Sequence, residues 1–251
     1  MGGYTSGKII RMMNPATGKM VDEIEVSYRP YFIYALPGGQ AIVGHTLRPW
    51  EEEVYACEVL DMNSNTVAKT LYYKGIVLEV LHPPEGKFYI GITDVDQKYG
   101  GYTLVEFDPQ TNDTVGEPIT LRTDFMFETA AFATSSKIYA PKPPAEGEMS
   151  SGWTLAVLEF PSGNTLKTIP VSDWPHDIIV VGQKTYVTQF SGVPTLDPEN
   201  QGTISVIDVN TDQVLKTLTV CTGPQHIAYS ESTGKIYVAC VKGKISVIDP
   251  S

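Results

Sequence analysis

The stretch Thr203-Ile-Ser-Val-Ile-Asp208, followed by the turn Val209-Asn-Thr-Asp212 and by Gln213-Val-Leu-Lys-Thr-Leu-Thr-Val220, decides the fold of this chain. Apolar and polar residues alternate on both sides of the turn, which is the pattern of two half-buried strands. An Asp or Asn at the start of such a turn stabilises it, because its side chain accepts hydrogen bonds from the backbone N–H groups just ahead. We therefore predict a β-hairpin over 203–220.

The same hairpin recurs along the whole chain. Complete copies cover 8–26, 54–72, 103–121 and 154–171, and a truncated copy, Lys244-Ile-Ser-Val-Ile-Asp249, ends the sequence. The copies follow one another at intervals of roughly 40 to 50 residues, which is the length of one four-stranded propeller blade.

A second pair of strands lies between consecutive hairpins, so each repeat has four strands, A to D. The pair is clearest around the turn Glu231-Ser-Thr-Gly234. Three short sequences resemble the repeat of the YVTN propeller family: Gly-Lys-Ile-Tyr-Val-Ala (234–239), Ile-Ser-Val-Ile-Asp (204–208 and 245–249) and Gly-Pro-Gln-His-Ile (223–227). The resemblance implies an all-β, WD40-like repeat protein: a β-propeller of four-stranded antiparallel blades that forms one domain over 1–251.

A β-sandwich or a β-solenoid could use the same hairpins, but solenoid coils are shorter and sandwiches seldom keep so long a period.

The strand count leaves the number of blades open. The chain opens with strands C and D and stops after A, B and C, so strand C occurs once more than each of the others. Five blades fit best, with strand D of the last blade supplied by 20–26 and with 8–13 left over. Six blades, or a fragment of a larger propeller, are the alternatives.

The charge and hydropathy of the chain narrow the possible partners. Its 251 residues carry a net charge of -11. The chain lacks a cluster of Lys and Arg, so it should repel a phosphate backbone, and we expect no nucleic-acid partner. Its apolar runs are too short to span a bilayer, and residues 1–8 lack the apolar core of a signal peptide. We expect a soluble cytoplasmic protein without membrane contact, although a secreted protein whose signal peptide had been removed would look the same.

The three cysteines, Cys57, Cys221 and Cys240, are expected to be ordinary buried thiols. Their number is odd and they show no CxxC spacing, which argues against both a disulfide framework and a zinc site. Free cysteine packs like a small apolar residue.

Four of the connections between strands B and C are long: 45–53, 94–101, 141–152 and 189–202. In a propeller these connections lie on the same face as the D–A connections, around the central channel. Long loops on one face of a repeat architecture indicate a recognition surface. Tolerated insertions are the alternative interpretation.

Polar residues of several kinds stand where strand A begins. A carboxylate, imidazoles, an amide and a phenol at the mouth of one channel suit a small polar ligand, whereas a solvated mouth with satisfied hydrogen bonds is the alternative. Glu128 and His176 could hold a divalent metal ion, the one cofactor the sequence suggests, or could act as an acid and base pair. The candidate ligand-binding residues at these positions are Tyr31, Glu128, His176, Asp177, Gln225 and His226.

Four further aromatic residues are candidates for the same mouth: His45, Trp50, Trp153 and Trp174. Aromatic faces beside a few polar groups can hold a sugar, a flat metabolite or a peptide side chain. Packing between blades is the alternative for each tryptophan.

The motifs of the common enzyme classes are missing from the sequence, among them GxSxG, HExxH, the P-loop and the dinucleotide glycine pattern. Our leading interpretation is therefore a non-catalytic propeller that binds a small polar ligand, a peptide or a protein through its long B–C loops. Propellers that the chain resembles also include enzymes, which implies an alternative: a metal-dependent lactone hydrolase or lyase with its site at the central channel. No catalytic residue is assigned.

Overall fold

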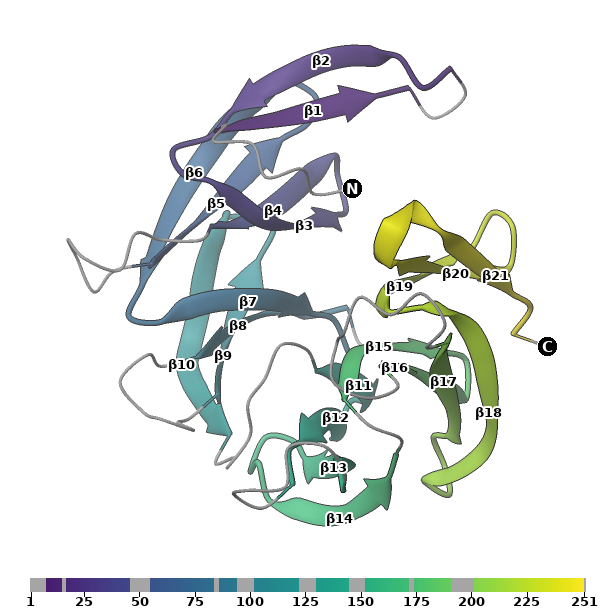
Figure 1. Ribbon diagram of the computed structural model, residues 1–251. Helices are drawn as coiled ribbons and strands as arrows, with labels where there is room; N and C mark the ends of the chain where they lie inside the picture. Colours follow the sequence, from purple (N-terminus) through teal and green to yellow (C-terminus); the bar gives the residue numbers. More distant parts are fainter. Residues whose placement is uncertain are drawn as a thin grey trace. The chain divides into compact units, whose positions relative to one another are not determined.

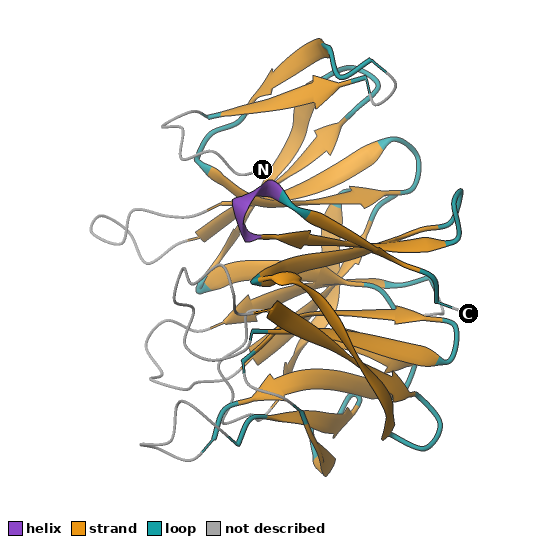
Figure 2. Cartoon of the chain, turned by 45° about the vertical axis from the view of Figure 1, so that its right-hand side comes forward, coloured by secondary structure: helices purple, strands orange, loops and turns teal. Residues whose placement is uncertain are grey.

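The computed structural model describes residues 8–14, 17–45, 55–83, 86–93, 102–121, 130–144, 152–171, 174–190 and 201–250. Figure 2 shows that these residues form strands almost throughout. The helical element in this part of the chain is a single 3-10 turn, η1 (Val241–Gly243). Over the same ranges, the structure contains no helix with the length and hydropathy needed to cross a membrane.

The strands form a two-stranded hairpin and five antiparallel sheets (Figure 1). The hairpin consists of β1 (Ile9–Met13) and β2 (Met20–Glu25). The first sheet contains β3 (Pro30–Leu36), β4 (Gln40–His45), β5 (Tyr55–Asp61) and β6 (Thr66–Tyr73). The second contains β7 (Ile76–Leu81), β8 (Phe88–Thr93), β9 (Tyr102–Asp108) and β10 (Asp113–Leu121).

The remaining three sheets follow in chain order. The third contains β11 (Ala131–Thr134), β12 (Lys137–Lys142), β13 (Thr154–Glu159) and β14 (Thr165–Pro170). The fourth contains β15 (Pro175–Val181), β16 (Lys184–Gln189), β17 (Gln201–Asp208) and β18 (Gln213–Thr222). The fifth has only three strands in the described residues: β19 (Pro224–Ser230), β20 (Lys235–Cys240) and β21 (Ile245–Ile248).

The hairpin predicted over 203–220 is formed by β17 and β18. Its turn is stabilised as expected, because Oδ1 of Asp208 accepts hydrogen bonds from the backbone N–H groups of Asn210 and Thr211, at 3.0 and 2.7 Å. The predicted order of strands A to D within each repeat is also confirmed, since consecutive strands are hydrogen-bonded neighbours in every sheet.

The N-terminal hairpin predicted over 8–26 is confirmed. Its strands β1 and β2 pair from Ile9 opposite Glu25 to Met13 opposite Met20. The pairing is supported by an ion pair between Arg11 and Glu23. Within the described sheets β2 is hydrogen-bonded to β1, so the completion of the last blade by 20–26 stays a prediction.

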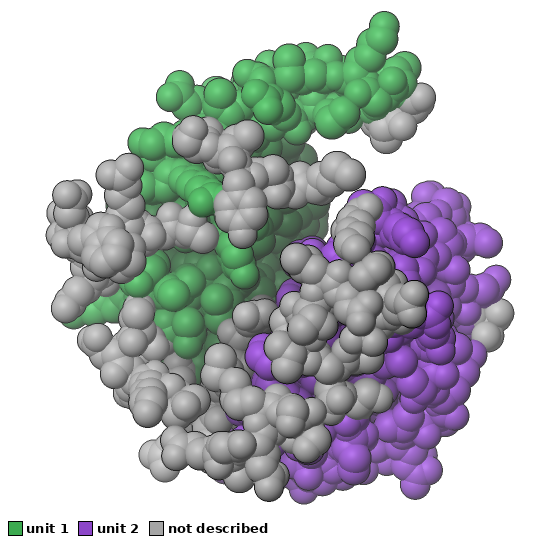
Figure 3. Space-filling view, viewed as in Figure 1, with its two compact units in different colours: residues 1–82, 86–120 green, residues 83–85, 121–251 purple. Residues whose placement is uncertain are grey.

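The chain forms two compact units, coloured separately in Figure 3. Unit 1 comprises Met1–His82 and Gly86–Thr120, and it holds the hairpin and the first two sheets. Unit 2 comprises Pro83–Glu85 and Leu121–Ser251, and it holds the other three sheets.

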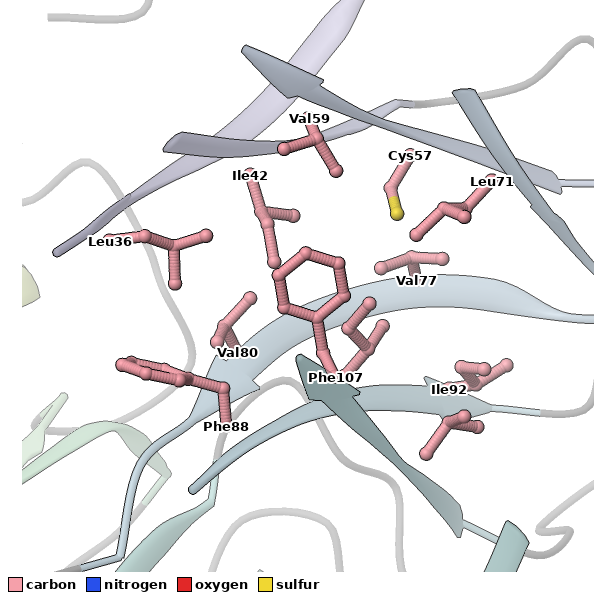
Figure 4. Packing of buried hydrophobic residues seen from close by; sticks show 12 residues of the cluster. Leu36, Ile42, Cys57, Val59, Leu71, Val77, Val80, Phe88, Ile92 and Phe107 are labelled. Atoms are coloured by element: carbon pink, nitrogen blue, oxygen red, sulfur yellow. The ribbon is translucent and has the colours of Figure 1, made fainter. Parts of the chain in front are cut away.

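In unit 1 the two sheets pack face to face through apolar side chains. Figure 4 shows this cluster, in which residues of β4 and β5 in the first sheet meet residues of β7, β8 and β9 in the second. Removal of this much apolar surface from water is the main stabilising term of the fold. The side chains at the centre include Ile42, Cys57, Val59, Val77 and Val80.

Unit 2 repeats the same packing. Ile204 and Val206 of β17 are fully buried against Ile227 of β19 and Val238 of β20. Strand C of one sheet thus packs on strands A and B of the next.

A second tie between neighbouring sheets comes from the last residue of the turn between strands C and D. This residue has a left-handed backbone, with φ of 56° at Asn112 and 53° at Asp212. Oδ1 of Asn112 accepts a hydrogen bond from Gln40, and Oδ1 of Asp212 accepts one from Lys137 at 2.6 Å. Asn and Asp tolerate this backbone conformation better than most residues, which explains their place in the turn.

The cysteines differ from the expectation of three free thiols. Cys221 of β18 and Cys240 of β20 form a disulfide bond, whereas Cys57 is free and buried as predicted. The prediction was wrong for the bonded pair because β18 and β20 belong to different sheets. Only the packing of one sheet on the next brings their Cα atoms to 6.0 Å.

Candidate functional site

In unit 2 the first residues of two neighbouring strands A come together. His176 and Asp177 lie at the start of β15, and Gln225 and His226 lie at the start of β19. Nδ1 of His176 is 2.8 Å from the backbone carbonyl oxygen of Gln225. A carbonyl can only accept, so Nδ1 carries the proton, and the Nε2 of a neutral ring keeps the lone pair.

The two imidazoles of this site lie edge to face. The ring centroids of His176 and His226 are 5.8 Å apart, with an angle of 86° between the planes. The side chain of His226 is 75% exposed. The ring of His226 is therefore presented to solvent from a strand whose backbone is paired with β20.

Asp177 holds the two strands in place. Its Oδ2 accepts a hydrogen bond from the backbone N–H of Ile227 at 3.0 Å and lies 3.6 Å from Nδ1 of His226. Its own backbone N–H donates to Oγ1 of Thr188 at 2.9 Å. Because this carboxylate binds the backbone of the neighbouring sheet, Asp177 fixes the distance between the two histidines.

Aromatic side chains border the histidine pair. The ring of Phe190 is 5.3 Å from the ring of His176, almost perpendicular to it. The backbone N–H of Phe190 donates to the carbonyl of Trp174, which has a left-handed φ of 47°. The Trp174 ring lies 5.4 Å from the ring of Trp153, which is buried. Two of the predicted tryptophans thus form a pair, and Trp174 stands two residues before His176 in the sequence.

A buried polar group at the end of β16 was not predicted from the sequence. Gln189 is fully buried, and its amide exchanges hydrogen bonds with the hydroxyl of Ser205 at 2.9 and 3.1 Å. Thr203 donates to the same amide oxygen at 3.1 Å. The sequence carried no separate signal for this group, because Ser205 follows the alternation of polar and apolar residues in β17. Buried polar groups of this kind are retained only when they are satisfied, and this one ends the strand next to Phe190.

Two of the predicted residues that the structure describes lie in unit 1. Tyr31 is 59% exposed on β3. His45 is buried, and its Nε2 donates to Oε2 of the buried Glu58 at 3.0 Å. The same carboxylate accepts the backbone N–H of Ser27. Burial lowers the pKa of His45, so the neutral imidazole is favoured. The arrangement of His45 stabilises the sheet, and its role toward a ligand stays a prediction.

Other predicted features fall outside the described residues. These are Trp50, Glu128 and most of the four long B–C connections. Within the described ranges, no group of three or more His, Cys, Asp or Glu side chains is arranged to hold a metal ion. A divalent metal at Glu128 and His176 therefore stays a prediction.

Unit 2 also has an open groove of about 420 Å³, away from the histidines. Phe160 and Leu166 supply its apolar lining, and Lys137 supplies a charge. The ammonium of Lys137 is already bound to Asp212 at 2.6 Å. We regard the histidine pair as the stronger candidate, because its polar groups converge from two strands.

The comparisons with known proteins support the fold. No family model matches the sequence, and no curated protein matches it. Solved structures do match. Hydrazine synthase of Kuenenia stuttgartiensis is 14% identical, with a TM-score of 0.69 over 96% of this chain and 70% of that chain. The WD40 domain of Neurospora crassa Pan2 is 11% identical, with a TM-score of 0.65 over 98% of this chain and 70% of that chain.

The Dos1 propeller is 12% identical, with a TM-score of 0.57, and the chain spans 58% of its length. At such identities the likeness shows the fold alone. Together with the repeated sheets, it shows that this chain is an all-β protein with the fold of a five-bladed β-propeller, whose fifth blade has three strands in the described residues.

Proposed function

We propose that this propeller is a non-catalytic binding protein that recognises a small polar ligand or a peptide where β15 and β19 begin. The observation that carries the proposal is the approach of the His176 and His226 rings to 5.8 Å. Two side chains from different blades converge there, which is how propellers and other repeat proteins commonly build binding surfaces.

The chemistry of the site defines the class of ligand. Imidazole can donate or accept a hydrogen bond and also offers an aromatic face. Phe190 adds an apolar edge beside His176. A ligand that combines a hydrogen-bonding group with a flat or apolar part fits this surface, and a peptide side chain or a small metabolite meets that description.

The repeat itself is proposed to be of the YVTN type. The motif sequences that resemble the family fall on β17 and β21, on β20, and at the start of β19. The site residues Gln225 and His226 belong to the last of these motifs, so the proposed site is part of the repeat.

A capture experiment tests the function. Immobilised protein is exposed to peptide and metabolite pools, bound compounds are identified by mass spectrometry, and their affinity is measured by calorimetry. We expect His226→Ala and His176→Ala to weaken binding at least tenfold, which is about 1.4 kcal/mol. Tyr229→Ala is the matched control, because Tyr229 is 41% exposed on the same strand. Failure to capture any compound, or equal affinity of all variants, would refute the proposal.

A further inference from the structure

The disulfide bond lies beside the connection between β18 and β19, just before the residues of the histidine site. Cys221 belongs to the end of β18, and Gln225 and His226 follow it after a short connection. Cys240 is the residue of β20 that lies opposite Pro224 in the pairing of β19 with β20. The covalent bond therefore anchors the connection 222–224 to β20 of the fifth sheet.

Non-covalent contacts fix the same connection. Gly223 has a left-handed φ of 58°, and its carbonyl accepts the backbone N–H of Val241 at 2.9 Å. A Cβ atom on Gly223 would lie 2.8 Å from the side chain of Val241 and 3.0 Å from the ring of Phe190. The connection is thus packed between η1 on one side and the aromatic edge of the site on the other.

The hydroxyl of Ser246 joins the disulfide to the last strand. It accepts the backbone N–H of Cys221 at 3.2 Å and lies 3.1 Å from the sulfur of Cys221. Three elements of the fifth blade therefore hold Cys221: β20 through the disulfide, β21 through Ser246, and the connection itself.

We propose that the Cys221–Cys240 disulfide positions the two histidines of the binding site. With the bond intact, the carbonyl of Gln225 accepts a hydrogen bond from Nδ1 of His176, and the rings of His226 and His176 lie edge to face. Without it, only non-covalent contacts hold the end of β18 beside β20, and the connection that leads to Gln225 and His226 loses its covalent anchor. Cys221 and Cys240 are positioning residues, and the oxidised state of the protein is the binding-competent one. This inference rests on the proposed function, which makes the histidine pair a binding site.

Its first test is a thiol count. Denatured, unreduced protein is alkylated and weighed, and we expect one modified cysteine, Cys57. Three modified cysteines would overturn the proposal.

The second test follows the imidazole signals of the ligand-free protein by NMR. The chain has four histidines, and His45 and His82 belong to unit 1, where they serve as internal references. Reduction with dithiothreitol breaks the S–S bond: the bond takes up two electrons and two protons to give two thiols, and the reagent is oxidised to its own disulfide. We expect the signals of His176 and His226 to move by more than a line width, while those of His45 and His82 stay.

Two variants separate positioning from general stability. Gly223→Ala keeps the disulfide but places a Cβ atom against Val241 and Phe190, which displaces the connection away from Phe190, so it should move the same two signals. Cys57→Ala removes a buried thiol of unit 1 and should leave both signals in place. Unchanged His176 and His226 signals in Gly223→Ala, or after reduction, would overturn the proposal and leave the disulfide with a stabilising role only. Because no ligand is added, this outcome is independent of the capture experiment.

Discussion

Val247 of β21 is 54% exposed, whereas Val206, which occupies the same position of β17, is fully buried. Each residue stands two positions before the Asp that begins the turn, within the same five-residue sequence Ile-Ser-Val-Ile-Asp. Val206 is covered by β19 and β20 of the following sheet. The burial of a blade residue therefore depends on the next blade and not on the repeat that carries it.

This relationship predicts different costs for the same substitution. Val206→Ala should lower the free energy of unfolding by about 2 kcal/mol, because it removes buried methyl groups and leaves a cavity. Val247→Ala should change it by less than about 0.5 kcal/mol, as is usual at exposed positions. Urea denaturation of both variants measures the difference. Equal losses would show that Val247 is buried in solution.

The buried pair of His45 and Glu58 predicts a dependence of stability on pH. Burial lowers the pKa of His45 below its ordinary value of about 6.5. Below pH ~6.5 the unfolded chain takes up a proton that the folded state resists, so the unfolded chain binds more protons and stability falls as the pH decreases. Denaturation curves at several pH values between 7.5 and 5.5 measure this slope. His45→Gln should reduce it, and an unchanged slope in that variant would assign the effect to other groups.

From the contacts of Asp212 we predict that its side chain stabilises the packing of the third sheet against the fourth. It accepts hydrogen bonds from Lys137 and Tyr139, and Lys167 lies 3.3 Å from its second oxygen. Asp212→Ala should cost about 1–3 kcal/mol for the donors left without an acceptor. Asp212→Asn keeps an acceptor and the tolerance for a left-handed backbone, so it should cost less. Thermal and urea unfolding distinguish the two, and equal losses would argue for the charge rather than the hydrogen bonds.

The same carboxyl should contribute to acid sensitivity. Burial alone would raise the pKa of Asp212, but the hydrogen bonds from Lys137 and Tyr139 outweigh it and lower the pKa. The stabilisation is present above the ordinary pKa of about 3.9 and is lost as the pH falls through the lowered value. Acid unfolding of Asp212→Asn should therefore depend less on pH in this range than that of the wild type.

The thiols predict a simple reactivity pattern. Burial raises the pKa of Cys57 to about 12, so very little thiolate forms near pH 8. With Cys221 and Cys240 joined in a disulfide, native protein should not react with a thiol reagent such as dithionitrobenzoate, and denatured protein should release one equivalent. Rapid reaction of the native protein would contradict the burial of Cys57 or the disulfide.

Several of the site residues could be placed from the sequence because strand starts are local features. The alignment of the repeats put His176, Asp177, Gln225 and His226 at the beginning of strands A, and the structure has them there. Their roles could not be separated in this way. Asp177 binds the backbone of Ile227, and His45 is buried against Glu58, and both facts depend on partners far away in the sequence.

By itself, the sequence determined the strands, their order within each blade and the Asp-led turns, because alternation and turn chemistry act over a few neighbouring residues. Tertiary structure alone decided which copy of Ile-Ser-Val-Ile-Asp is buried, which cysteines are bonded and which histidines meet. These outcomes depend on the packing of one sheet against the next, and a contact between residues of separate sheets leaves no periodic trace in either strand.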